Sequence, residues 1–345
     1  MTAPGTLGKG AGAEEALRNY FLSQGYFVVR AVPFNYKGFA VTDVDLWLYM
    51  KSSSLACERT CVDVKRKKTP QAIERVLWTK GLREVLGLDR AVVVTTDNRK
   101  ETREFGAQHS ITVLPGDFLQ RVVHNFSSQS DRISEELFIN ELRVPCIFDT
   151  TVYFTRFYNE AKATLISGLN FNGCNILLNK LRFIIQEYIA SNKTSKASLR
   201  LLYVLMSYLI VTIDYSSRVL IHLDIIHRKE ILEDGFRYGE SGRERTQDIV
   251  NTALHLLTDF PRFGLISPEE INKQMQSELL NYPADILAEY FSRPEILKRL
   301  FLLSREFDKL AYSIDVPPPH ECPSELKGIL GLLCDFFKLP RRDVI

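Results

Sequence analysis

Charged residues interrupt two apolar runs near the N-terminus, "TDVDLWLYM" (residues 42–50) and "CVDVKRKKTP" (residues 61–70). Both runs alternate apolar and polar residues with a period of two, which predicts β-strands. Residues two apart in a strand project to the same face, so Asp43 shares a face with Asp45, and Asp63 shares one with Lys65. A buried charge without a partner is costly. If the two strands pair, their charged side chains converge, and a bound ligand must offset that cost.

The first third of the chain alternates helix and strand signals. Its pattern predicts a helix at 14–23, three strands at 26–32, 42–50 and 59–65, a helix opened by Thr69-Pro70, a strand at 90–96, a helix near 99–108 and a strand at 111–114. The helix after Pro70 carries an apolar stripe, which consists of Ile73, Val76, Leu77, Leu82, Val85 and Leu86. The order αβββαβαβ predicts an α/β or α+β domain over residues 1–125.

The rest of the chain changes character after a polar, serine-rich stretch at 124–132, which we interpret as a linker. Helical patterns follow near 132–142, 173–191, 195–213, 243–259, 268–280, 294–314 and 323–337. The charge-dense segment 227–246 interrupts them, and we expect a solvated connection there in preference to a partner-binding loop. No fixed repeat is visible, so we predict an irregular all-α domain over residues 131–345.

Charge is distributed unevenly between these two parts. Residues 1–125 carry 18 Lys and Arg against 13 Asp and Glu, a net charge of +5, whereas the remainder carries −3. A basic bias suits a domain that contacts phosphate, although an ordinary solvated surface explains it equally well. The Tyr- and Phe-rich segment 148–158 could form a stacking or interface surface, but we expect ordinary core residues there.

Several classes of protein are disfavoured. Six scattered cysteines do not make a disulfide framework, and Cys57 and Cys61 lack a second ligand pair for zinc. The N-terminal segment has no apolar core of a secretory signal, and the longest apolar run, 201–213, is shorter than a membrane span needs. We therefore expect a soluble, cytoplasmic protein with no membrane association.

The converging carboxylates favour a hard divalent cation. Mg²⁺ prefers a few carboxylate oxygens together with waters and a phosphate, and a neighbouring lysine can stabilise charge that develops during phosphate chemistry. The Asp63-x-Lys65 triplet alone is also compatible with a cross-strand ion pair on a protein surface. The surrounding sequence decides between these interpretations.

Residues 8–120 resemble the PD-(D/E)XK nuclease superfamily, most closely its Mrr-like and Holliday-resolvase-like branches. "GKGAGAEEALRNYFLSQGY" is similar to the first helix of the family, in which a Glu precedes Gly-Tyr by eleven residues; this spacing selects Glu14 over Glu15. "TDVDLWL" resembles the metal-binding strand, with Asp45 as the motif residue and Asp43 as second choice. "CVDVKRKK" resembles the closing strand.

The chain departs from the family pattern in two places. The proline that classically precedes the first motif aspartate is replaced by Val44, and Mrr-like proteins often carry Gln where this chain has Asp63. A carboxylate at that position is the general form of the motif. The resemblance therefore identifies the superfamily more firmly than the branch.

The resemblance implies a restriction-endonuclease-like fold, a central mixed sheet flanked by helices, and a role for each matching residue. Asp45 and Asp63 would hold Mg²⁺ or Mn²⁺, assisted by the Val64 carbonyl and by Glu14, and Lys65 would orient or activate the attacking water. The reaction would be phosphodiester hydrolysis in DNA, with RNA as the alternative polymer, serving restriction, phage defence or DNA repair. Residues further along the chain would contact backbone phosphates, namely Arg66, Lys67, Lys68 and Lys80.

A second hypothesis is a catalytically inert, nuclease-like subunit of a larger assembly. Inert domains of this kind usually lose a carboxylate or the lysine, whereas this chain retains Glu14, Asp45, Asp63 and Lys65. Under either hypothesis we expect the helical half to form a homo-oligomer, to bind a protein partner or to gate the nuclease.

Overall fold

The N-terminal part is built on one mixed β-sheet. The structure is a computed structural model and describes residues 9–66, 71–127, 131–258 and 268–345. The strand order is β1-β2-β3-β4-β5, with bounds Phe27–Tyr36, Phe39–Lys51, Cys57–Lys65, Arg90–Thr95 and Thr112–Leu114. β2 is antiparallel to both β1 and β3, and β3, β4 and β5 run parallel. The predicted order of elements and the mixed sheet are confirmed.

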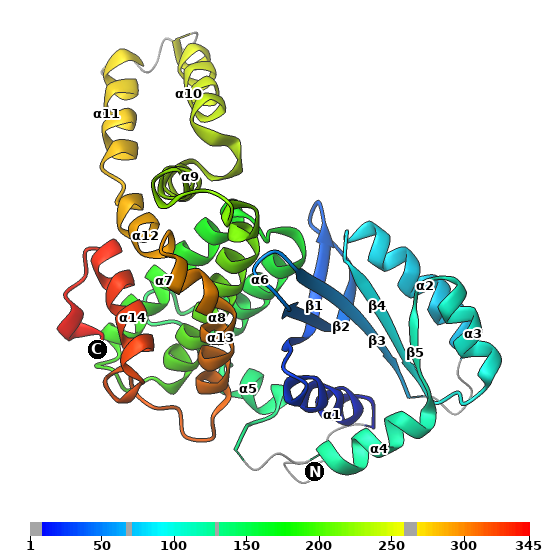
Figure 1. Cartoon of the computed structure of the whole chain (residues 1–345). Helices are drawn as coiled ribbons and strands as arrows, with labels where there is room; N and C mark the ends of the chain where they lie inside the picture. The colour runs from blue at the N-terminus through cyan, green and yellow to red at the C-terminus, as the bar shows by residue number, and fades with distance from the viewer. Residues whose placement is uncertain (1–8, 67–70, 128–130, 259–267) are drawn as a thin grey trace.

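Helices cover both faces of this sheet (Figure 1). On one face, α1 (Lys9–Ser23) and α4 (Gly116–Phe126) bury a core formed by alternate strand residues such as Leu46, Leu48, Val62 and Val64. On the other face, α2 (Ala72–Val85) and α3 (Lys100–Gln108) lie over the parallel half. These two helices are the crossovers that parallel strands require.

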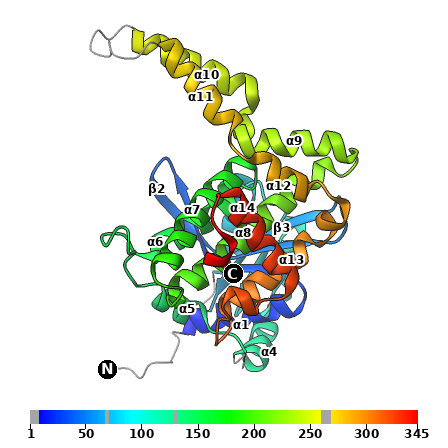
Figure 2. The same cartoon turned by 90° about the vertical axis from the view of Figure 1, so that its left-hand side faces the viewer.

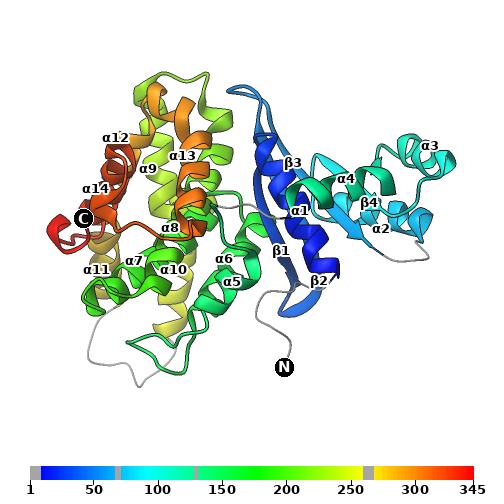
Figure 3. The same ribbon diagram turned by 90° about the horizontal axis from the view of Figure 1, so that it is seen from below.

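The C-terminal part is mostly helical and packs against the antiparallel half of the sheet, as Figure 3 shows from below. Its helices are α5 (Glu135–Glu141), α6 (Phe154–Ser167), α7 (Phe171–Ala190), α8 (Lys196–Ser217), α9 (Ile225–Tyr238), α10 (Gly242–Thr258), α11 (Pro268–Leu280), α12 (Ala284–Phe291), α13 (Pro294–Tyr312) and α14 (Ser324–Phe336). Helices α10 and α11 form a hairpin that projects from the body (Figure 2).

Helix α8 is the centre of this part. In the portion of the chain that the structure describes, the segment Lys196–Leu220 alone is long and apolar enough to cross a membrane, and that apolar stretch is wholly buried inside the protein. It is surrounded by α7 and α13 and reaches the sheet, where Tyr208 makes an edge contact with Phe27 of β1. The segment therefore has the environment of a core helix.

One hydrophobic core contains residues of both parts. Phe27, Trp47 and Tyr49 of the sheet belong to the same buried cluster as the α8 residues. The predicted domain boundary at residues 125–131 remains a prediction. The hydrophobic core is continuous across the two parts. Helix α4 covers residues 124–126 of the predicted linker, and residues 128–130 lie outside the described ranges.

Segment 227–246 was predicted to be a solvated connection, and this prediction was wrong. It forms most of α9 and the start of α10. Asp224 caps α9 by accepting bonds from the backbone N–H groups of Ile226 and His227, while Leu232 and Phe236 are buried. Most of the dense charges lie on the other faces of an amphipathic helix, which hid its period in the sequence. Arg228 is the exception, because it is buried and donates to the carbonyls of Leu220 and Ser292.

Candidate functional site

The two acidic strands separate at the candidate site. The pairing of β2 with β3 ends at Leu46 and Val62, so Asp45 and Asp63 would be the next opposite pair. Residues directly opposite in an antiparallel pair share a face. The carboxylate of Asp45 instead accepts a hydrogen bond from the backbone N–H of Val64 at 2.7 Å. Both aspartates line one pocket at the point where β2 leaves β3, and their joint action as a site stays a prediction.

A backbone irregularity lies on the other side of Asp45. In the β1–β2 register, Arg30 pairs with Leu46 and Val32 pairs with Val44. Ala31 and Asp45 lie opposite each other between these pairs, but they are not paired. Ala31 has φ of 47°, a left-handed conformation that is uncommon for any residue with a Cβ. Such conformations persist only where the surroundings hold them, and they cluster at functional sites. Asp45 therefore lies opposite a backbone irregularity in β1 and just beyond the end of its pairing with β3.

Asp63 is buried and surrounded by positive charge. Its side chain is 8% exposed, and the guanidinium of Arg75 on α2 binds both of its carboxylate oxygens. The Lys65 ammonium lies 3.9 Å from Oδ1 of Asp63, a loose contact, and the Lys65 side chain is one-third exposed. The Asp63–Lys65 pairing was predicted, whereas the Arg75 contact was not.

Arg75 is the residue that sequence reasoning missed. With Trp78, Thr79 and Leu82 it forms the face of α2 that lines the site. These residues follow the i, i+3, i+4, i+7 spacing of one helix face, which shows that they share a face but not that this face contacts Asp63. The predicted apolar stripe of α2 was partly wrong. Leu77 and Val85 of that stripe are exposed, and the buried face of the helix is centred on Val76 and Thr79 instead.

Asp45 carries a charge that its surroundings do not compensate. Burial, followed by repulsion from Asp63 and Glu14, raises its pKa to about 6, although the Val64 N–H and the Lys65 charge act in the opposite direction. Near neutral pH this carboxylate is ionised at a free-energy cost. A bound cation would remove that cost.

Glu14 lies near the aspartates but is held by another residue. Its carboxylate accepts a bond from Arg30 of β1 at 3.0 Å, and Arg30 also binds Glu15 and Glu136. Glu15 is buried within this arrangement, whereas Glu14 is partly exposed. The preference for Glu14 over Glu15 remains a prediction, supported by the influence of Glu14 on Asp45.

A pocket of about 140 Å³ lies between the aspartates and α2, and Glu14 is not among its lining residues. Its lining includes Asp43, Asp45, Asp63 and Lys65, and its opposite wall is the α2 face that carries Arg75. Asp43 is exposed at the rim. Of the residues predicted to contact phosphates, Arg66 is exposed, Lys80 does not line this pocket, and Lys67 and Lys68 lie outside the described residues.

A divalent cation fits this donor set. Within the described ranges, no group of three or more His, Cys, Asp or Glu side chains could hold a metal by itself. Mg²⁺ commonly binds through only one or two carboxylates and takes its other ligands from water and phosphate. Asp45 and Asp63 meet that requirement, provided that Arg75 releases Asp63. The carbonyl of Val64 and Glu14 remain predicted additional ligands.

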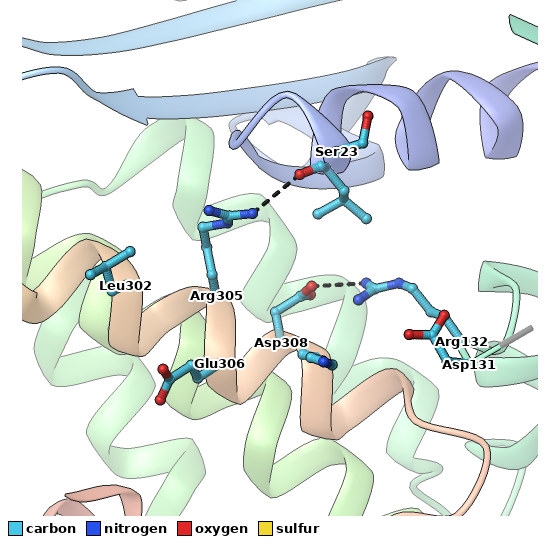
Figure 4. A pocket seen from close by; sticks show the side chains of 9 residues that line it. Ser23, Asp131, Arg132, Leu302, Arg305, Glu306 and Asp308 are labelled. Atoms are coloured by element: carbon cyan, nitrogen blue, oxygen red, sulfur yellow. Dashed lines mark hydrogen bonds and ion pairs between the residues drawn. The ribbon is translucent and has the colours of Figure 1, made fainter. Parts of the chain in front are cut away.

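A larger pocket, of about 380 Å³, lies between the end of α1, residues 131–132 and α13 (Figure 4). Three of its charged groups are engaged with the protein. Arg305 donates to the Leu22 carbonyl at 3.1 Å, and Arg132 pairs with Asp308 at 2.8 Å. This pocket joins the two parts of the chain, and Asp308, one of its two aspartates, is paired with Arg132. The smaller pocket is therefore the candidate site.

Comparison with known proteins gives no further assignment: no family model, curated protein or solved structure matches this chain.

The pKa of Asp45 predicts an unusual pH dependence of stability. A carboxyl group whose pKa is about 6 when folded and about 3.9 when unfolded binds more protons in the folded state, so the protein loses stability as pH rises from about 4 through 6. The loss is on the order of 1–3 kcal/mol. We expect Asp45→Asn to be more stable than wild type by this amount at pH 8 and equal to it near pH 4, in urea unfolding with EDTA.

The exposed Asp43 provides a matched control, because Asp43→Asn should change the free energy of unfolding by less than about 0.5 kcal/mol at both pH values. An Asp45→Asn variant less stable than wild type at pH 8 would contradict this account of the Asp45 environment.

Proposed function

We propose that this protein is a metal-dependent endonuclease that hydrolyses phosphodiester bonds in DNA, with a restriction-endonuclease-like N-terminal domain. One observation carries the proposal: Asp45 and Asp63, which lie next to the last pair of the β2–β3 ladder, line one pocket together with Lys65 and Arg75. Carboxylates for a cation and cationic groups for a phosphate are the components that phosphodiester hydrolysis requires.

Each residue has a distinct role in this proposal. Asp45 and Asp63 hold a divalent cation, which when bound acts as a Lewis acid and lowers the pKa of water. Lys65, tethered loosely beside Asp63, positions the attacking water and stabilises the negative charge that accumulates on the phosphate. Arg75 neutralises Asp63 in the cation-free protein and, once released, binds a phosphate oxygen from the α2 wall.

The helical part is proposed to act by association, as a homo-oligomer or by binding a protein partner. Its projecting α10–α11 hairpin offers a surface for this (Figure 2). The second candidate function, an inert nuclease-like subunit, is favoured by one observation only, the Arg75–Asp63 pair that occupies a proposed ligand. The pathway, whether restriction, phage defence or repair, and a cytoplasmic location belong to the proposal as expectations.

The proposal is tested by a cleavage panel of supercoiled plasmid, single-stranded DNA, branched DNA and RNA, each in Mg²⁺, Mn²⁺ or EDTA. We expect wild type to nick or cut DNA with either cation and to be inactive in EDTA. Cleavage of RNA alone would identify RNA, and not DNA, as the substrate. An absence of cleavage in every arm, with a partner co-purifying, would support the inert subunit instead.

A further inference from the structure

The β1–β2 hairpin extends beyond the candidate site without any covering element. Every residue from Asn35 to Val41 is exposed, and Figure 2 shows this end of the hairpin, beside the label β2, projecting from the body. Its tip is strongly apolar for a solvated turn. Phe39 is 74% exposed, more than any other large hydrophobic side chain among the residues described, and Tyr36 is 60% exposed.

The tip is built to hold two rings in place. Tyr36 and Phe39 are paired directly across the hairpin and are joined by Lys37 and Gly38, which have φ of 46° and 86°. Two successive positive φ angles are the pattern of a type I′ turn, whose twist matches that of the flanking strands. A register shift between Phe34 and Asn35 marks a β-bulge just below the tip. The two rings are therefore presented on a defined backbone.

The tip carries a positive charge, which attracts the negatively charged backbone of a polynucleotide. The Lys37 ammonium lies 5.5 Å from the centre of the Tyr36 ring, and residues 31–42 contain no Asp or Glu. Exposed aromatic rings beside a positive charge bind unpaired bases by stacking, without reading their sequence. A lipid surface or a second protein would also accept apolar rings, but neither would explain why the hairpin belongs to the strand that carries Asp45.

The spacing along β2 connects the tip to the site. Asp45 follows Phe39 by six positions along β2, which is about 20 Å of strand. A single strand whose phosphate lies at Asp45 can reach the tip within a few nucleotides. Trp78, half-exposed in the pocket wall with the Arg75 guanidinium 5.8 Å from its ring centre, offers another ring nearer the site.

We propose that Tyr36 and Phe39 stack on unpaired bases of the substrate, so that the protein prefers DNA with a single-stranded segment beside the cleaved phosphate over a continuous duplex. This inference rests on the proposed nuclease function and assigns its substrate class. The rings position the strand and take no part in bond cleavage.

The test is binding of a single-stranded oligonucleotide containing 2-aminopurine, whose fluorescence is quenched by stacking, to the full-length protein in EDTA. We expect Tyr36→Leu and Phe39→Leu each to weaken binding about 10-fold and to reduce the quenching, because leucine keeps the apolar character but removes the ring. Phe39→Trp should restore both. Phe148→Leu is the matched control, since Phe148 is 60% exposed, and should change neither.

Cleavage measurements on the same variants separate the two proposals. Loss of quenching in the tip variants, with no cleavage by wild type, would retain the stacking surface and reject the nuclease. Cleavage by wild type, with affinity and quenching unaltered in both tip variants, would reject the stacking surface and retain the nuclease. Quenching retained while the tip variants change oligomeric state in light scattering would overturn the inference in favour of a protein interface.

Discussion

Lys65→Ala is expected to cleave DNA about 10²- to 10³-fold more slowly than wild type under single-turnover conditions, with the fold unchanged. This is the loss that follows removal of one preorganised group from a site of developing negative charge. Stability should change little because the Lys65 ammonium is 3.9 Å from Asp63 and its side chain is one-third exposed. Arg75 remains to neutralise Asp63 in the variant.

Lys100→Ala provides the control for a general loss of positive charge. Lys100 is an exposed residue of α3, paired only along its own helix with Glu104, and its removal should leave the cleavage rate within about twofold of wild type. Circular dichroism and the urea midpoint should be the same for wild type and both variants. Equal rates for wild type and Lys65→Ala would remove Lys65 from the mechanism.

Replacing Glu135 should have the largest effect on stability. Glu135 is buried between the sheet and the helical part, where it accepts bonds from Lys162 at 2.9 Å, Tyr158 at 2.8 Å and Tyr312 at 2.6 Å. Burial alone would raise its pKa, but the charges of Lys162 and Arg18 prevail and lower that pKa to about 2. We expect Glu135→Leu to lower the free energy of unfolding by about 3–5 kcal/mol, since it strands a buried ammonium.

The neighbouring Glu136 is the matched control. It pairs with Arg30, but its side chain is more than one-third exposed and Arg30 keeps two other carboxylate partners, so Glu136→Gln should cost less than about 1 kcal/mol. The double variant Glu135→Leu/Lys162→Met should recover part of the loss because it removes both charges. Equal stability of wild type and Glu135→Leu in guanidinium unfolding at pH 7 would contradict this account.

The same group also predicts an acid limit. Because the folded pKa of Glu135 is below its unfolded value of about 4.3, its contribution is complete above pH 5 and is lost as pH falls through 4 toward 2. Wild type should therefore lose more stability than Glu135→Leu between pH 5 and pH 3.

The sheet and the acidic pair could be predicted from sequence because both depend on local periodicity. Period-two alternation identified β2 and β3, and the same period placed Asp45 and Asp63 on their strands. Helix α6 was not among the predicted helices, although the expectation that its aromatic residues are ordinary core is met by Phe154 and Tyr158, which are buried one turn apart. Elements rich in aromatic residues have no distinctive local signal when tertiary packing determines which face is buried.

The partners of the site residues could not be predicted, because they depend on contacts between distant segments. Arg75 reaches Asp63 only because the β3–α2–β4 crossover lays one face of α2 on the strand ends. Glu14 is held by Arg30, and Arg30 is held in turn by Glu136, which is 106 residues away. No spacing rule reports an ion pair between segments so far apart.

The central claim, that Asp45 and Asp63 together hold a divalent cation, is tested most directly by calorimetric titration of Mn²⁺ into wild type and Asp45→Asn at pH 8 and pH 5. We predict that wild type binds Mn²⁺ at pH 8, that affinity falls at pH 5 because Asp45 is then protonated, and that Asp45→Asn binds none at either pH. No binding by wild type at pH 8, or equal binding by Asp45→Asn, would contradict the claim.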